Sequence, residues 1–186
     1  MELYFILAQI VGLIALSLEI FRFQAKSSKS FFYFEPILAA LYTLQFYLLS
    51  APAAVATSAI GIVRGVCGIR FSEILIRKAV IFVFIPSYMI CTYIVYQTPL
   101  DLLPGIALLC SSITFLIRDN RYWVARLYLL NTALWIIYSI PVEAYVHVLN
   151  GLLVFTSIAI GIFRHEKFYK KRFNNFMGRF AQKSPA

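Results

Sequence analysis

Charged residues are scarce in this chain: Asp, Glu, Lys and Arg make up 13% of its 186 residues, whereas 61% are hydrophobic. A soluble domain usually carries roughly 25% charged and about 45–50% apolar residues. A water-soluble core of this size could not hide so much apolar surface, so an ordinary soluble globular domain is excluded. The composition instead predicts an all-α polytopic membrane protein embedded in a lipid bilayer.

Residues that support catalysis or metal binding are also few. The chain has three cysteines and two histidines, and an odd cysteine count without C-x-x-C spacing argues against a disulfide framework or a zinc site. Glu143 and His147 could hold a metal only with a third ligand, and the other histidine, His165, is expected on the opposite side of the membrane. Since there is no aspartate pair, serine–histidine arrangement or H-E-x-x-H motif, we expect no enzyme activity, metal or cofactor.

Apolar segments of membrane-spanning length number seven. A spanning helix needs about 20 mostly apolar residues, with a lower limit of about 17. The second segment is the least certain, and we expect Pro36 in its first helical turn. The N-terminus lacks a basic region and a cleavage site, so the first segment is interpreted as a retained span and not a signal peptide. The predicted spans cover about 3–22, 35–51, 54–70, 78–96, 101–118, 122–140 and 146–163.

Lys and Arg alternate along the chain with the predicted sides of the membrane. They fall in or beside the first, third and fifth connections and in the tail, whereas the N-terminus and the second, fourth and sixth connections have none. Cytoplasmic loops carry the excess of Lys and Arg. The pattern therefore predicts an odd number of spans, with the N-terminus periplasmic and the C-terminus cytoplasmic.

The tail is the most basic part of the chain. Residues 164–186 carry seven basic residues and one acidic residue, and their aromatic side chains recur at helical spacing. We expect a short interfacial helix on the anionic lipids of the inner leaflet. Because the net charge of +9 then follows membrane topology, nucleic acid is not expected as a partner.

The first three predicted spans resemble the last three in chain order. The matches are weak individually but stay in phase with the topology, which predicts a 3+1+3 parallel repeat of triple-helix bundles joined by a linker helix. Parallel repeats are one way in which transporters are built. The matches pair 16–24 with 110–118, 41–52 with 130–141, and 57–64 with 156–164. The expected parts are residues 1–71 (first bundle), 72–98 (linker), 99–164 (second bundle) and 165–186 (basic tail).

Several stretches resemble the bacterial inner membrane protein YgjV family: AQIVGLIAL (8–16), LQFYLLSAPAA (44–54), SAIGIVRGV (58–66) and, more loosely, LNGLLVFTSIAIGIFR (149–164). The family tends to have asparagine three residues before the arginine, where this chain has Gly61 and Gly161, which we expect to allow close helix approach. The resemblance implies a polytopic bacterial inner (plasma) membrane protein. More distantly, the architecture is similar to SWEET and PQ-loop transporters, but the proline–glutamine pair is absent, so sugar does not follow as substrate.

Polar residues at membrane depth are the candidate solute-lining positions. Asn131 and Trp135 are four residues apart and share a helical face. Amide side chains beside an aromatic ring suit a small polar, largely uncharged solute, although such groups can also hydrogen-bond between helices and only hold a bundle together. The candidate set is Asn131, Trp135, Asn150, Gln45, Ser58 and Ser157.

Three titratable residues are candidates for an intramembrane ion pair or for proton coupling. Charges within a membrane are costly and usually face a partner or the interior of the bundle. Glu19 and Arg64 lie at similar depth, so we expect them to pair; the alternative is that Arg64 snorkels to the headgroups. His147 titrates near neutrality and could couple transport to protons, although an ordinary interfacial histidine is the simpler interpretation.

Two functions remain open at this point. One is transport of a small-molecule solute by alternating access between the two bundles, which requires polar residues from both bundles to meet at mid-depth. The other is a membrane scaffold, accessory or sorting protein, in which Asn131 and Asn150 would face separate helix contacts. A seven-helix chain can hold a pathway alone, so a homo-oligomer is optional.

Overall fold

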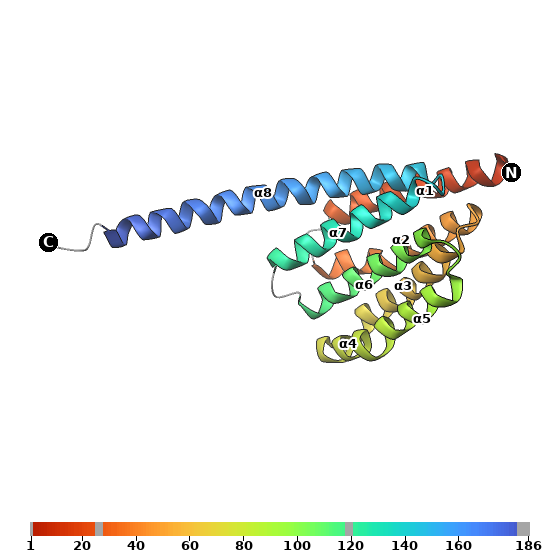
Figure 1. Ribbon diagram of the computed structural model, residues 1–186, viewed down its shortest axis with the longest axis horizontal. Coiled ribbons are helices and arrows are strands. Elements are labelled where there is room, and N and C mark those ends of the chain that lie inside the picture. The colour runs from red at the N-terminus through yellow and green to blue at the C-terminus, as the bar shows by residue number, and fades with distance from the viewer. Residues whose placement is uncertain (1, 25–27, 118–120, 182–186) are drawn as a thin grey trace.

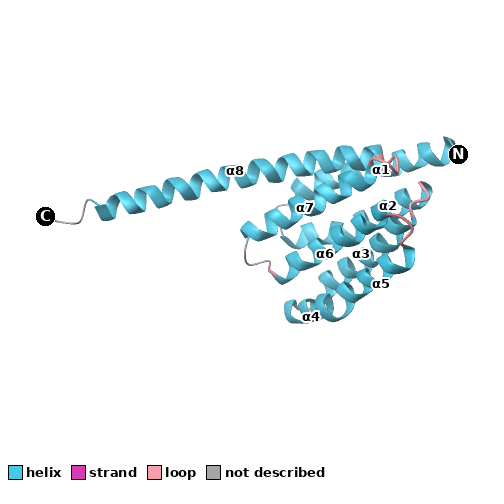
Figure 2. Ribbon diagram, viewed as in Figure 1, coloured by secondary structure: helices cyan, strands magenta, loops and turns pink. Residues whose placement is uncertain are grey.

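The computed structural model describes residues 2–24, 28–117 and 121–181, and this part of the chain is helical throughout, with no strand (Figures 1 and 2). Side chains of 22–32, 115, 118–122 and 164–186 lie outside the description. The elements are α1 (Glu2–Gln24), α2 (Ser28–Leu48), α3 (Pro52–Arg70), α4 (Glu73–Ala79), a π-helical turn η1 (Val80–Phe84), α5 (Ile85–Val95), a 3₁₀ turn η2 (Pro99–Asp101), α6 (Leu102–Leu116), α7 (Arg121–Ser139) and α8 (Tyr145–Ala181).

The described residues form seven helical segments, because α4, η1 and α5 follow one another without a break. The all-helical prediction is therefore confirmed. Four segments of the described chain are long and apolar enough to span a membrane: Glu2–Phe21, Pro52–Arg70, Glu73–Val95 and Tyr145–Phe163. A shorter apolar helix covers Pro99–Thr114. These features agree with a polytopic membrane protein.

The second helix starts earlier than the sequence predicted. It begins at Ser28 and not near residue 35, so Pro36 lies inside the helix and the prediction of a first-turn proline was wrong. A proline inside a helix is tolerated in membrane proteins where a neighbouring helix compensates. Gly65 of α3 provides the space: a Cβ atom there would lie 3.0 Å from the Pro36 nitrogen. The missing side chain therefore lets α3 pack directly on this turn of α2.

The last helix is longer than predicted. The backbone of α8 runs as one helix from Tyr145 to Ala181, past the predicted boundary at residue 164. Figure 1 shows its C-terminal half extending beyond the other helices. No proline occurs between 142 and 184 to stop it. The tail is thus continuous with the last span, and the predicted contact of its side chains with lipid lies outside the described residues.

Six of the segments close into a ring. Along it, α1 packs on α2, α2 on α3, α3 on α6, α6 on α7, α7 on α8, and α8 on α1. The linker helix α5 contacts α3 and α6, so it lies beside the junction where these two helices meet. A cluster of Ile76, Val80, Phe84, Tyr88 and Leu108 fixes the linker segment there.

A second apolar cluster gathers where α2 turns into α3 and α7 turns into α8. Ser50 and Glu143 have positive φ angles of 55° and 58° in these turns, the conformation that commonly ends helices. In each turn the following alanine amide donates to a carbonyl five residues back, Ala51 to Phe46 and Ala144 to Ser139. The members of this turn cluster are Phe46, Ala51, Ala53, Ala54, Tyr138 and Ala144.

The outside of the helical bundle is apolar. Large side chains with most of their surface exposed include Phe82 (75%), Tyr93 (85%) and Ile94 (72%). By contrast, many of the buried side chains are polar, including Gln45, Thr57 and Ser112. An extended apolar exterior marks a surface that is covered by lipid or by another apolar partner. This polarity is the reverse of that of a soluble helical bundle.

Candidate functional site

A cavity of about 190 Å³ lies among the six ring helices. This is far more than the roughly 10–15 Å³ that one water needs. The first three helices contribute Glu19, Glu35, Leu38, Ala39, Tyr42, Phe46, Ser58, Gly61 and Arg64. The last three contribute Leu108, Ser111, Tyr128, Asn131, Thr132, Trp135, His147, Asn150, Gly151 and Val154.

Arg64 forms the charged end of this cavity. Its Nη2 atom lies 3.1 Å from Glu35 Oε1, and its Nη1 atom donates to Ser112 Oγ at 3.0 Å. The guanidinium carbon also lies 6.0 Å from the centre of the Tyr88 ring. The Arg64 side chain is only 5% exposed, so the alternative that it snorkels to the headgroups was wrong.

Glu35 is a site residue that the sequence analysis missed. The predicted second span began at about residue 35, which placed Glu35 at its very end; because α2 begins at Ser28, Glu35 lies within the helix and reaches Arg64. A helix start at Ser28 would have put Glu35 at the depth of Arg64 and pointed to the pair. Glu19 is buried and lines the same cavity, so its predicted pairing with Arg64 stays a prediction.

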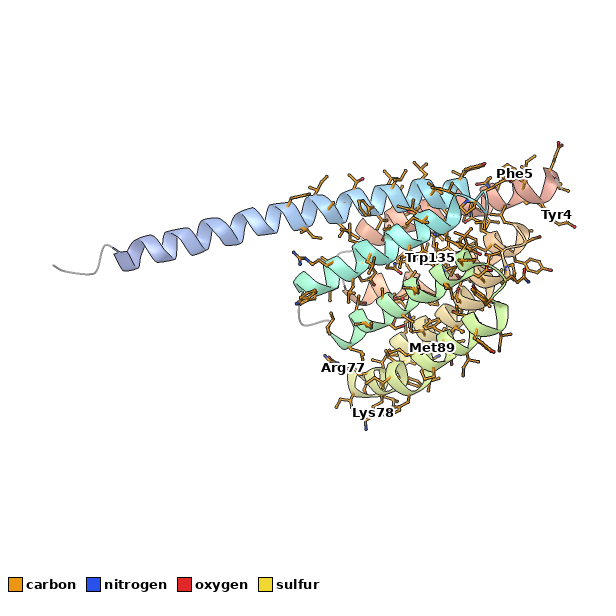
Figure 3. All side chains as sticks on the ribbon, in the orientation of Figure 1. Tyr4, Phe5, Arg77, Lys78, Met89 and Trp135 are labelled. Carbon is orange, nitrogen blue, oxygen red and sulfur yellow. The ribbon has the colours of Figure 1, made fainter. Side chains whose placement is uncertain are left out.

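Aromatic rings crowd the other end of the cavity. Phe46 and Trp135 stack with ring centres 5.5 Å apart and an interplanar angle of 22°. His147 meets both rings edge-on, at 5.2 Å from Phe46 and 5.5 Å from Trp135. Tyr42 meets the imidazole at 4.6 Å. Figure 3 shows Trp135 on α7 within the bundle. The imidazole is therefore enclosed by three aromatic rings.

Two buried polar atoms in this region lack a hydrogen-bond partner among the described residues: Asn131 Oδ1 and His147 Nδ1. Asn150 differs, because its Nδ2 donates to the Tyr42 hydroxyl at 2.6 Å. Buried polar groups are nearly always satisfied, and the two unsatisfied atoms belong to residues that line the cavity. A water or a polar solute in the cavity would supply the missing bonds.

Two of the predicted lining residues lie elsewhere. Gln45 is fully buried and packs against α1, where a Cβ atom on Gly12 would lie 2.6 Å from its Nε2 atom. Ser157 is exposed on α8, beyond Val154, the last residue of that helix at the cavity. The other four, Asn131, Trp135, Asn150 and Ser58, line the cavity together.

The two glycines of the repeated sequence differ in their surroundings. Among the described residues, a Cβ atom on Gly61 would meet only Ala39, at 4.0 Å, and one on Gly161 would meet nothing within 4 Å. The expectation that both permit close helix approach was therefore wrong. Closer approaches occur at Gly65 and Gly151, where a Cβ atom would lie 3.0 Å and 2.6 Å from its neighbour. Gly61 instead lines the cavity.

Hydrogen bonds join the first three helices to the last three at several levels. Besides the Arg64–Ser112 and Asn150–Tyr42 bonds, Gln9 of α1 binds the turn before α8. Its Nε2 donates to the Glu143 carbonyl at 2.8 Å, and its Oε1 accepts from the Val146 amide at 3.2 Å. The side chain thus caps the first turn of α8, whose amides lack helical partners.

Residues 6–168 match the model of the Imp-YgjV family, which is described as a bacterial inner membrane protein. No curated protein and no solved structure matches the chain. The match runs from α1 through the spanning part of α8, and it confirms the resemblance found in the sequence. The chain therefore belongs to the Imp-YgjV family and is a multi-pass protein of the bacterial inner membrane.

Proposed function

We propose that this protein transports a small polar solute across the inner membrane by alternating access between its first and last three helices. The observation that carries the proposal is the cavity, which both groups of helices line with polar side chains. Polar residues are expensive within a membrane and usually mark a solute or ion path. Transporters commonly bind their solutes near the midplane, at the interface between repeats.

The packing order supports a parallel repeat. If α1, α2 and α3 are exchanged with α6, α7 and α8, the α3–α6 contact becomes the α8–α1 contact, and both are present. Phe46 and Trp135, which the sequence comparison aligned, stack against each other. The turns at Ser50 and Glu143 are also alike. A rocking motion of one bundle against the other would open and close the space between them.

The positions of the charges support an orientation for this path. Figure 3 shows Arg77 and Lys78 at the end of the bundle opposite to Tyr4 and Phe5. The basic end is cytoplasmic under the positive-inside rule. The turn cluster around Phe46 and Tyr138 then lies on the periplasmic side, and its Phe46 lines the cavity.

The scaffold alternative made a different prediction for the amides. It required Asn131 and Asn150 to face separate helix contacts, but both line one cavity. This placement favours the transporter.

Filling the cavity tests the proposal. Gly61→Leu should project into the cavity without a close backbone contact, and Gly161→Leu, where a Cβ atom meets nothing, is the matched control. A metabolite panel is screened by thermal shift on the purified protein, and each hit is followed in proteoliposome uptake. We expect hits to stabilise the native chain and Gly161→Leu but not Gly61→Leu. Equal stabilisation of Gly61→Leu, or hits that never enter the vesicles, would contradict transport through this cavity.

A further inference from the structure

The cavity combines opposite charges at one end with uncharged polar groups and aromatic rings at the other. Arg64 and Glu35 form an ion pair there and are largely buried, with 5% and 13% of their side chains exposed, and the buried carboxyl group of Glu19 lines the same cavity. Replacing a buried ion pair by apolar residues is often neutral or stabilising, so stability alone does not account for this one. An ionisable residue within the membrane is by default a sign of function.

From this arrangement we infer that the solute is a small zwitterion, a neutral α-amino acid whose side chain carries a hydrogen-bond donor. The inference rests on the proposed function, because it takes the cavity to be the solute site. Arg64 would receive the ligand carboxylate and Glu35 its ammonium group. Without ligand, the two residues neutralise each other in the ion pair seen in the structure. The ligand would replace this pair when it binds.

The energetics of burial distinguish a zwitterion from other solutes. An anion would engage Arg64 and draw it away from the buried carboxyl group of Glu35, whereas a cation that engages Glu35 would weaken the ion pair without supplying a carboxylate to Arg64. Removing one partner of a buried pair is strongly unfavourable. A zwitterion instead exchanges one ion pair for two. In Arg64, Nη2 contacts Glu35 and Nη1 donates to Ser112. The ligand carboxylate would therefore replace Glu35 at Nη2 while the bond to Ser112 is kept.

The uncharged end of the cavity defines the ligand side chain. Asn131 Oδ1 and His147 Nδ1 lack hydrogen-bond partners among the described residues, and the asparagine oxygen needs a donor. Trp135 lies beside His147 and offers an apolar surface. The cavity volume of about 190 Å³ is below the roughly 300–1,000 Å³ of sites for drug-sized ligands. A side chain such as the amide of L-glutamine meets these requirements.

Titration calorimetry on the full-length purified chain tests the inference. The probes are the amino acids that occur in proteins, at up to about 10 mM, which is enough to detect a Kd near 1 mM. L-Glutamine is compared with 2-oxoglutaramate, which lacks the ammonium group, and with 4-aminobutanamide, which lacks the carboxylate. We expect L-glutamine to bind, and each analogue to lose at least about tenfold in affinity, equivalent to about 1.4 kcal/mol. Analogues that bind as well as L-glutamine, or no binding by any amino acid, would overturn the inference.

Variants separate this inference from the proposed function. The double variant Glu35→Gln, Arg64→Gln removes both charges but keeps hydrogen-bonding groups, and Glu35→Gln alone is a milder change should the double variant not fold. The matched control is Glu73→Gln, Arg77→Gln, a pair at 2.9 Å outside the cavity. We expect the cavity variants to lose L-glutamine binding and the control to keep it. If the cavity variants bind L-glutamine normally, or if only uncharged solutes bind and Gly61→Leu blocks them, the zwitterion is wrong while transport stands.

Discussion

At the scale of single residues, the unusual feature is a buried arginine in a lipid-embedded bundle. Arg64 is held by Glu35, Ser112 and the face of Tyr88. These contacts come from α2, α6 and α5, so the charge ties three helices to α3. Substituting such an arginine alone destabilises the protein by more than the net contribution of the ion pair to folding, because the opposite charge is then left buried without its partner.

We predict that Arg64→Ala destabilises the protein by about 3–5 kcal/mol, because it leaves the Glu35 carboxylate without its counter-charge. The double variant Glu35→Leu, Arg64→Leu should recover most of this loss. Unfolding by denaturant in detergent measures both changes. The control, Arg77→Ala, breaks a pair whose side chains are 33% and 44% exposed, and pairs of this kind contribute about 0.3–0.5 kcal/mol. Equal losses in the single and double variants would contradict this account.

Sequence reasoning found the unusual arginine but not its observed partner. The depth of Arg64 followed from hydropathy, and its cost in lipid predicted a counter-ion. Choosing among carboxylates required the true start of α2, which Pro36 obscured, because proline usually marks a first helical turn. Asn131 and Trp135 could be grouped by helical spacing, whereas the positions of Gln45 and Ser157 away from the cavity depend on how the helices pack.

At the scale of elements, one of the contacts between the linker segment and the ring is very close. A Cβ atom on Gly105 of α6 would collide with the Thr92 hydroxyl of α5. Earlier in the same segment, the π-helical turn at Val80–Phe84 precedes Pro86, whose ring crowds the carbonyl four residues back. Widening the helix there relieves that crowding while the segment stays continuous.

We predict that Gly105→Ala destabilises the chain, because the added methyl group must push α5 away from α6. Overpacking of this kind costs about 1–3 kcal/mol. Thr92→Ala in the same chain should restore part of the loss by removing the colliding atoms. Thermal unfolding measures the three proteins. Gly161→Ala is the control and should be slightly stabilising, by roughly 0.5–1 kcal/mol, since alanine favours helices and meets no neighbour there.

Element boundaries were predicted less well than element number. Seven apolar segments could be counted from the sequence because hydropathy and the alternation of Lys and Arg along the chain gave the same number. The start of α2 and the end of α8 were predicted wrongly. A proline usually marks the start of a helix, and a change from apolar to charged residues usually marks the end of a span, but here both lie inside a helix. The close packing at Gly65 and Gly105 was also not predicted, because it depends on which helices become neighbours.

At the scale of the whole molecule, topology is the property on which a transport path depends. The proposed path requires seven crossings, which put the two ends of the chain on opposite sides, and every connection that lacks Lys and Arg should then be periplasmic. In this proposed arrangement the charged end of the ring, with Glu35 and Arg64, faces the cytoplasm.

We predict that alkaline phosphatase fused after Thr98 is active and that the same enzyme fused after Phe71 is inactive, because only the first site is periplasmic. Green fluorescent protein fused at the same two sites should give the reverse result. Enzyme activity and fluorescence in intact cells measure the outcome. Phosphatase activity at both sites, or at neither, would mean that Glu73–Val95 does not cross the membrane and that the two bundles do not run in parallel.

The uninterrupted length of α8 has a mechanical consequence. At a rise of about 1.5 Å per residue, the part beyond Phe163 is roughly 27 Å long, and it continues the segment that carries His147 and Asn150 at the cavity. Because the helix is continuous, a small tilt of its part beside the cavity displaces its distant end by a larger distance. A spin label near Ala181 would therefore report on movements of α8 beside the cavity.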